Sequence, residues 1–203
     1  MLIDKKTIVK ILKETAMFFK TNYDISKTSK MMDENQFWEI LKLSLENSSN
    51  LTDQERYLIK YLSKLTPEEI IGFRLRTDKL LYDSYISDLW CAAYIINGGC
   101  SDDSFEYFRT WLISRGKEIY YTAIKNPDIL IDYAEEDECD FESFWYVAIE
   151  AFKIVTKKEL YDYIDYDNFT YIEGNYPEIK FNWDDTPESQ KKICPKLFKK
   201  CNG

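Results

Sequence analysis

The chain has 203 residues, of which 45% are hydrophobic and 16% aromatic, and its formal net charge is −9. This length and composition predict a globular protein with a sizeable core and exclude a disordered chain. The negative charge argues against a nucleic acid or an anionic membrane as partner, because both affinities depend on basic side chains. It favours a basic protein partner instead.

The sequence contains no histidine and five cysteines. The missing imidazole excludes Ser-His and Cys-His nucleophile systems and most zinc sites. The odd cysteine count without any CxxC spacing is typical of reduced thiols in a cytoplasmic protein, so we expect a cytoplasmic location and no disulfide. No phosphate-binding loop, dinucleotide fingerprint or nucleophile elbow is present, so the residues indicate no cofactor and favour a non-enzymatic role without deciding it.

The N-terminal part differs from the rest of the chain in charge. Residues 1–30 carry seven lysines against three carboxylates, a net charge of +4, and the remainder carries −13. Apolar side chains at helical spacing predict a helix over residues 5–22, and its charged character predicts neither a signal peptide nor a membrane span. We therefore expect a helical extension and linker over residues 1–30, which packs on the domain, binds a partner or forms a mobile arm. The domain proper then covers residues 31–203.

Three helix starts follow within about 35 residues of one another. Asp33, Thr52 and Thr66 are each followed three residues later by a glutamine or glutamate, which is the capping-box pattern, and Pro67 takes the first helical position after Thr66. No Asn-Gly or Asp-Gly hairpin turn occurs in this region. The pattern predicts an all-α, or nearly all-α, single compact domain of several helices.

The centre of the chain predicts a helical hairpin. An apolar run over residues 88–96 is followed by Asn97-Gly98-Gly99, which ends a helix because glycine adopts the left-handed conformation freely. Ser101 is the expected N-cap of the next helix. Aromatic side chains at helical spacing give that helix an apolar face. The expected core includes Trp90, Phe105, Phe108, Trp111 and Trp145.

This central run, Asp88-Leu89-Trp90-x-Ala92-Ala93-Tyr94-Ile95-Ile96-Asn97-Gly98-Gly99 through Phe108-Arg109-x-Trp111-Leu112-Ile113, resembles the signature block of a bacterial family of uncharacterised proteins, the domain of unknown function family 4240. Met32-Asp33-Glu34, Leu65-Thr66-Pro67 and Cys194-Pro195-Lys196-Leu197-Phe198 resemble its first, next and closing segments. The resemblance covers about residues 32–200. It implies a fold type and a bacterial origin, and no established activity.

The last third of the chain is less regular. Asp140 is the expected cap of a helix over residues 141–157, and residues 160–185 predict an irregular segment with a short strand around residues 168–172. The basic tail over residues 189–201 is expected to dock on the domain through its apolar side chains.

Two groups of residues are candidate functional sites. The first is a polar cluster in an apolar setting at the glycine turn. Its structural interpretation is a helix cap with Arg109 paired to Asp88 or to a capping aspartate, and its functional interpretation is a small pocket of an enzyme or ligand-binding protein. Two aspartates beside a helix start disfavour an anion, but no pattern specifies a metal, and we predict none. This polar pocket would consist of Asp88, Asn97, Ser101, Asp102, Asp103 and Arg109.

The second group is an acidic, tyrosine-containing surface formed by residues 132–142 and 159–173. Seven carboxylates lie within residues 132–142, where the ordinary interpretation is a solvated loop. Acidic rims speed association with basic partners and aromatic side chains contribute burial energy, so the functional interpretation is a protein-binding surface of an immunity-type or regulatory accessory protein. The sequence does not indicate the oligomeric state. The residues of this candidate surface are Glu135, Glu136, Asp137, Glu138, Tyr161, Tyr163 and Tyr166.

Overall fold

A computed structural model describes residues 23–133, 139–171 and 175–202 of the protein. Within these ranges the chain forms α-helices and short 3-10 helices (η) and no strand, with one isolated bridge between Thr28 and Ile164. The predicted all-α fold is therefore confirmed. The expected helix over residues 5–22 lies outside the described residues. The helices are α2 (Glu34–Glu46), α3 (Leu51–Leu62), α4 (Pro67–Asp83), α5 (Ser87–Asn97), α6 (Asp102–Ser114), α7 (Lys117–Lys125), η1 (Pro127–Tyr133), η2 (Glu142–Tyr146), α8 (Val147–Thr156), η3 (Leu160–Tyr163), α9 (Pro187–Ile193) and α10 (Pro195–Asn202).

The helix starts follow from side-chain caps. Asp33 accepts hydrogen bonds from the first free backbone N–H groups of α2, and Thr66 and Glu69 form the reciprocal capping box of α4 with Pro67 at its first position. The expected start of α3 at Thr52 is wrong by two residues. Asn50 caps this helix by accepting from the Asp53 N–H at 2.9 Å, because an asparagine oxygen is as good an acceptor as a threonine hydroxyl.

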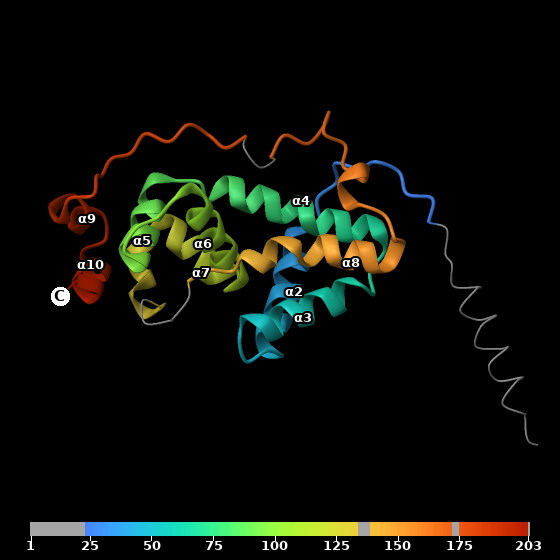
Figure 1. Ribbon diagram of the computed structural model, residues 1–203, viewed down its shortest axis with the longest axis horizontal. Helices are drawn as coiled ribbons and strands as arrows, with labels where there is room; N and C mark the ends of the chain where they lie inside the picture. Colours follow the sequence, from blue (N-terminus) through green and yellow to red (C-terminus); the bar gives the residue numbers. More distant parts are fainter. Residues whose placement is uncertain (1–22, 134–138, 172–174, 203) are drawn as a thin grey trace, which may run out of the picture.

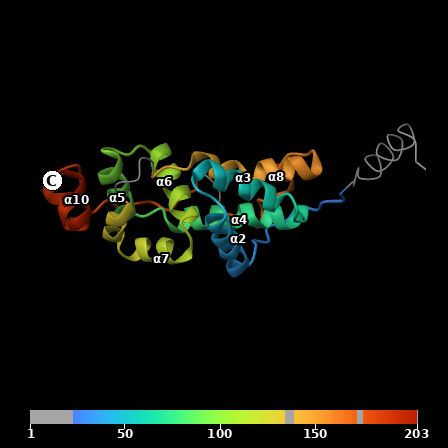
Figure 2. The same ribbon diagram turned by 90° about the horizontal axis from the view of Figure 1, so that it is seen from below.

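The helices form an elongated body (Figures 1 and 2). Helix α8 packs against α3 and α4, α6 packs against α4, and α10 packs against α5 and η1. One continuous hydrophobic core joins them. The five aromatic side chains expected in this core are all buried: Trp90, Phe105, Phe108, Trp111 and Trp145.

An extended segment runs along the body from η3 to α9, beside α4 (Figure 1). We call its described residues, 164–171 and 175–186, the strap. The strap has neither helix nor strand, so the short strand expected around residues 168–172 is absent from its described part. The tail docks as expected: Leu197 and Phe198 are buried, and Asp128 caps α10 by accepting from the Lys196 and Leu197 N–H groups at 2.9 Å.

Residues 23–33 lie on the helical body. The Thr28 N–H donates to the Tyr163 carbonyl at 3.0 Å, and the Met32 N–H donates to the Gly72 carbonyl of α4 at 2.8 Å. A β-carbon added at Gly72 would lie 3.0 Å from the Met32 nitrogen. Glycine is therefore what allows this segment to approach the backbone of α4.

Candidate functional site

The strap is attached to the helical body by a row of aromatic pairs. The ring centroids of the four pairs lie between 4.5 and 5.5 Å apart, and the Tyr85 and Tyr176 rings are stacked with an interplanar angle of 12°. From one pair to the next, the residue number increases both in the helices and in the strap. The strap therefore runs parallel to the path of the chain through α4 and α5. The pairs are Tyr82–Tyr171, Tyr85–Tyr176, Trp90–Phe181 and Tyr94–Trp183.

Side-chain hydrogen bonds fix one end of the strap to the start of α5. The Asn182 side-chain amide donates to Asp88 at 2.8 Å, the Ser87 hydroxyl donates to the Asn182 oxygen at 2.7 Å, and the Trp183 Nε1–H donates to the Ser87 carbonyl at 2.8 Å. Asp88 thus anchors the strap.

Arg109 of α6 is 1% exposed and is held largely by backbone carbonyls. Its Nη1 donates to the Leu81 carbonyl at 2.6 Å and its Nε donates to the Phe105 carbonyl at 3.2 Å. Its ion pair, at 4.0 Å, is with Glu106 on the same helix. The expected pairing of Arg109 with Asp88 or with a capping aspartate is therefore wrong. Backbone carbonyls, not aspartates, accept the hydrogen bonds of the guanidinium.

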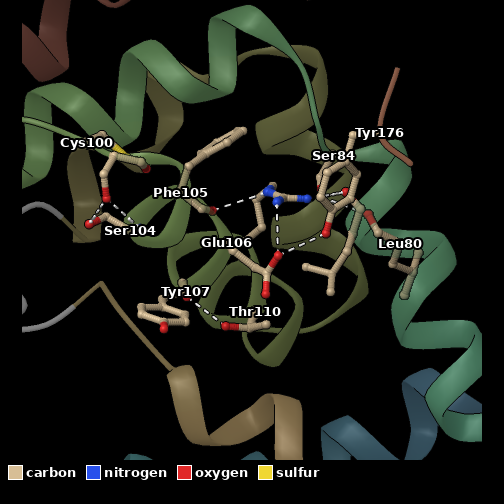
Figure 3. A network of polar contacts seen from close by, with 12 residues as sticks. Leu80, Ser84, Cys100, Ser104, Phe105, Glu106, Tyr107, Thr110 and Tyr176 are labelled. Carbon is tan, nitrogen blue, oxygen red and sulfur yellow. Dashed lines mark hydrogen bonds and ion pairs between the residues drawn. The ribbon is translucent and has the colours of Figure 1, made fainter. Parts of the chain in front are cut away.

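Aromatic rings enclose the same guanidinium. Its central carbon lies 5.0, 4.8 and 4.6 Å from the ring centroids of Tyr85, Phe105 and Tyr176. The Tyr176 hydroxyl donates to the Glu106 carboxylate at 3.1 Å (Figure 3). Burial raises the pKa of the Tyr176 hydroxyl to about 12, with Arg109 opposing and Glu106 adding to the shift, so this group is a donor at neutral pH.

A cavity of about 520 Å³, which we call the strap pocket, opens between α6 and the strap. This volume lies within the range of small-ligand sites. Its strap side includes Tyr176, Glu178 and Phe181. Its helical side is lined by Tyr85, Trp90, Asp102, Asp103, Glu106 and Arg109.

The strap pocket contains three of the six residues of the predicted polar pocket: Asp102, Asp103 and Arg109. The other three do not line it. Ser101 caps α6 by accepting from the Ser104 N–H at 3.2 Å, Asn97 is exposed at the end of α5, and Asp88 holds the strap.

The sequence interpretation missed Tyr85, Glu106 and Tyr176 as members of this site. The spacing of Glu106 and Arg109, three residues apart on one helix, was an available signal.

Cys100 lies close to this site. Burial raises the pKa of its thiol to about 12, with Arg109 opposing and Asp102 adding to the shift. A thiol of this pKa stays protonated at neutral pH and is a poor nucleophile. Its presence therefore gives no support to covalent catalysis at the strap pocket.

A second buried arginine lies on α4. Arg74 is 3% exposed and forms an ion pair with Asp78 at 2.8 Å. Its guanidinium lies 3.6 Å from the ring centroid of Trp145 and donates to the Trp145 carbonyl and to the Tyr161 hydroxyl, both at 3.2 Å. A tyrosine from the predicted partner surface is thus held in place by a buried ion pair.

Part of the predicted partner surface can be placed. Glu135, Glu136, Asp137 and Glu138 lie outside the described residues. Tyr161 and Tyr166 are 41% and 45% exposed. Tyr163 is half-buried and packs against Phe152 at a centroid distance of 5.7 Å. Of the predicted tyrosines, only Tyr161 and Tyr166 therefore present large exposed rings.

Comparison with known families matches residues 32–154 to a family model described as "Protein of unknown function (DUF4240)". The chain belongs to this family. The DUF4240 match includes the whole helical side of the strap pocket and both buried arginines, and it ends before the strap and the closing Cys194–Phe198 segment. No curated protein and no solved structure matches the chain significantly.

The described ranges lack two further features. No helix there is long and apolar enough to cross a membrane. Over the same ranges, no three cysteine or carboxylate side chains are grouped so that they could hold a metal ion.

Proposed function

We propose that this DUF4240 protein is a cytoplasmic interaction module that binds a basic protein partner through a tyrosine surface formed by Tyr161, Asp162, Tyr166 and Asp167. The supporting observation is the distribution of exposed apolar side chains. Five large ones are exposed among the described residues, and four of these lie within residues 146–166. Exposed aromatic side chains gathered in one part of a fold are typical of interaction sites.

The rigidity of Tyr161 supports this role. Its hydroxyl accepts from Arg74, which is fixed in turn by Asp78. A tyrosine whose orientation is already set loses little side-chain entropy when a partner covers it. Tyr161 is therefore the expected anchor of the interface.

Carboxylates neighbour the two tyrosines in sequence. Asp162 and Asp167 are exposed and directly follow Tyr161 and Tyr166, and residues 135–138 add four acidic groups in sequence whose position is not described. Negative groups around an aromatic centre steer basic partners and raise association rates. An immunity-type protein that neutralises a basic toxin, or a regulatory accessory protein that docks on a basic partner, would use this chemistry.

Charge reversal tests the proposal. Once a partner is purified, Asp162→Lys with Asp167→Lys should slow association by about tenfold at low salt and less at high salt, while leaving the melting temperature nearly unchanged. Asp185→Lys with Glu188→Lys, two exposed carboxylates near the start of α9, are the matched control. Equal association rates for both double variants would refute the tyrosine surface. Reversal of residues 135–138 to lysine then measures whether that acidic run belongs to the same surface.

A second candidate is a ligand-binding or enzymatic role for the strap pocket. It is favoured by one observation, that Asp102, Asp103 and Arg109 line a single cavity of ligand size. This second candidate is tested by measuring which class of ligand, if any, binds to the strap pocket.

A further inference from the structure

We propose that the strap pocket binds an organic cation: a guanidinium or ammonium group, carried by a basic side chain of a partner or by a free small molecule. This inference rests on the second candidate function and is independent of the tyrosine surface, which is formed by η3 and the first part of the strap. Loss of either activity would therefore leave the other intact.

The aromatic lining of the pocket is the first reason. Rings from the helical body, Tyr85 and Trp90, and from the strap, Tyr176 and Phe181, all line the cavity. The face of an aromatic ring attracts cations electrostatically, and sites of several such rings are used to recognise ammonium groups. Phe181 is 52% exposed, so much of its ring surface is still open to contact.

The charge of the lining is the second reason. Asp102, Asp103 and Glu178 are exposed at the pocket, whereas Glu106 and Arg109 form an ion pair with each other. Within the described ranges, no basic side chain forms an ion pair with any of these three carboxylates. The field of Asp102 reaches into the aromatic lining: burial raises the pKa of the Tyr85 hydroxyl, and Asp102 raises it further against the opposing effect of Arg109. A ligand entering here meets negative charge beside aromatic faces.

The protein already holds one guanidinium in this setting. Arg109 lies over the rings of Tyr85 and Tyr176 and forms its ion pair with Glu106. Its Nη1 and Nε protons are directed at the carbonyls of Leu81 and Phe105. Arg109 is therefore poorly placed to receive an anion, and the pocket's own chemistry is that of a second site for a cation.

The strap supplies one side of this site. Tyr176, Glu178 and Phe181 lie beyond the DUF4240 match, whereas the opposite side of the pocket lies within it. The helices supply Tyr85 and Arg109 on the surface that forms one side of the pocket. The strap converts that surface into a pocket and adds a carboxylate.

Calorimetric titration of the full chain tests the proposal with two cationic probes, N-acetyl-arginine methylamide and choline. N-acetyl-glutamate methylamide and Mg²⁺ are the controls for an anion and for a cation without apolar surface. We expect at least one organic cation to bind with a dissociation constant of about 1 mM or below, and neither control to bind comparably. Preference for the arginine derivative identifies a partner's side chain as the source, and preference for choline identifies a free small molecule.

Substitutions locate the binding. A triple variant that combines Asp102→Asn, Asp103→Asn and Glu178→Gln should bind the organic cation about tenfold more weakly. Phe181→Ala should weaken the same binding about fivefold. Asp185→Asn, an exposed carboxylate on the same strap that does not line the pocket, is the matched control and should change nothing. Glu178→Gln alone keeps the test valid if the α6 substitutions destabilise that helix. The proposal would be overturned if neither cation bound at a ligand concentration of about ten times the expected dissociation constant, or if all variants bound the cation equally well.

Discussion

The two buried arginines solve the same physical problem in different ways. Arg74 and Arg109 are 3% and 1% exposed, so each must replace the water that its charge has lost. Arg74 does so with a carboxylate on its own helix at 2.8 Å. Arg109 has its carboxylate at 4.0 Å and depends on the Leu81 and Phe105 carbonyls and on three rings.

The difference lies in what completes each centre. Asp78 and Trp145, which lie within the DUF4240 match, contact Arg74 directly, and Tyr161 adds one hydrogen bond from beyond the match, whereas the ring of Tyr176 in the strap covers Arg109. The direct ion pair at 2.8 Å makes the Arg74 centre the more self-contained of the two. The Arg109 centre has a cavity beside it, and the strap forms one wall of that cavity. The Arg74 centre is thus filled by side chains of the protein, whereas the Arg109 centre borders a cavity.

The largest effect is expected from Asp78→Ala. This change leaves the Arg74 charge buried without its carboxylate, which should lower the free energy of unfolding by about 3–5 kcal/mol. Urea denaturation followed by circular dichroism measures it. Asp83→Ala is the matched control, because Asp83 pairs with Lys79 on the same helix but is exposed, and its loss should cost less than about 1 kcal/mol. Equal losses for the two variants would contradict the role given to the buried pair.

Arg109→Met should have the next largest effect, about 2–4 kcal/mol in the same measurement. The change leaves the Leu81 carbonyl without its donor and Glu106 without its arginine. The loss should be smaller than for Asp78→Ala because the Glu106 side chain is 17% exposed and can turn to water. A larger loss would mean that the Arg109 centre is the more self-contained of the two.

Tyr176→Phe should cost about 1–2 kcal/mol, since it removes one hydrogen bond to a charged carboxylate and keeps the ring stack on Tyr85. Tyr161→Phe is its counterpart at the Arg74 centre, where the hydroxyl accepts from an arginine that already has its carboxylate. We therefore expect a smaller loss for Tyr161→Phe. A larger loss of unfolding free energy for Tyr161→Phe than for Tyr176→Phe in urea denaturation would contradict the difference described between the two centres.

The smallest effect concerns alkaline pH. Because the folded protein holds the Tyr176 proton with a pKa of about 12, against an ordinary value of 10.0, this residue's contribution to stability is complete below pH 10 and is lost as pH rises to 12. The free energy of unfolding should lose about 1 kcal/mol from this group by pH 11. Tyr176→Phe should remove that part of the decline and leave the parts due to Cys100 and Tyr121, because burial raises the pKa of each of these groups to about 12 as well. An unchanged pH profile would show that Tyr176 is not protected by the strap contacts.

The sequence predicted most of the helical body and only part of the site. Thr66 and Ser101 were identified as caps because capping is a local interaction, and Gly98 was placed at the end of α5, where its φ is 65°. The partner of Arg109 was missed because the Leu81 carbonyl lies 28 positions away and backbone acceptors leave no side-chain pattern. The strand expected around residues 168–172 is absent from the described part of the strap because Tyr171 packs on the Tyr82 ring of α4 and the described residues offer no neighbouring strand.

The separation in sequence between the strap and its anchor has a consequence for the order of events during synthesis. Ser87 and Asn182 bond across 95 positions, whereas the capping contacts of α2, α3 and α4 span two or three. A ribosome adds about 5–20 residues per second, so the helices up to residue 154 emerge a few seconds before Asn182 does. In that interval α4, α5 and α6 can pack while Tyr85, Trp90 and Arg109 face solvent. The nascent protein therefore passes through a stage at which its helical side is open, and the pocket closes only after the strap has emerged.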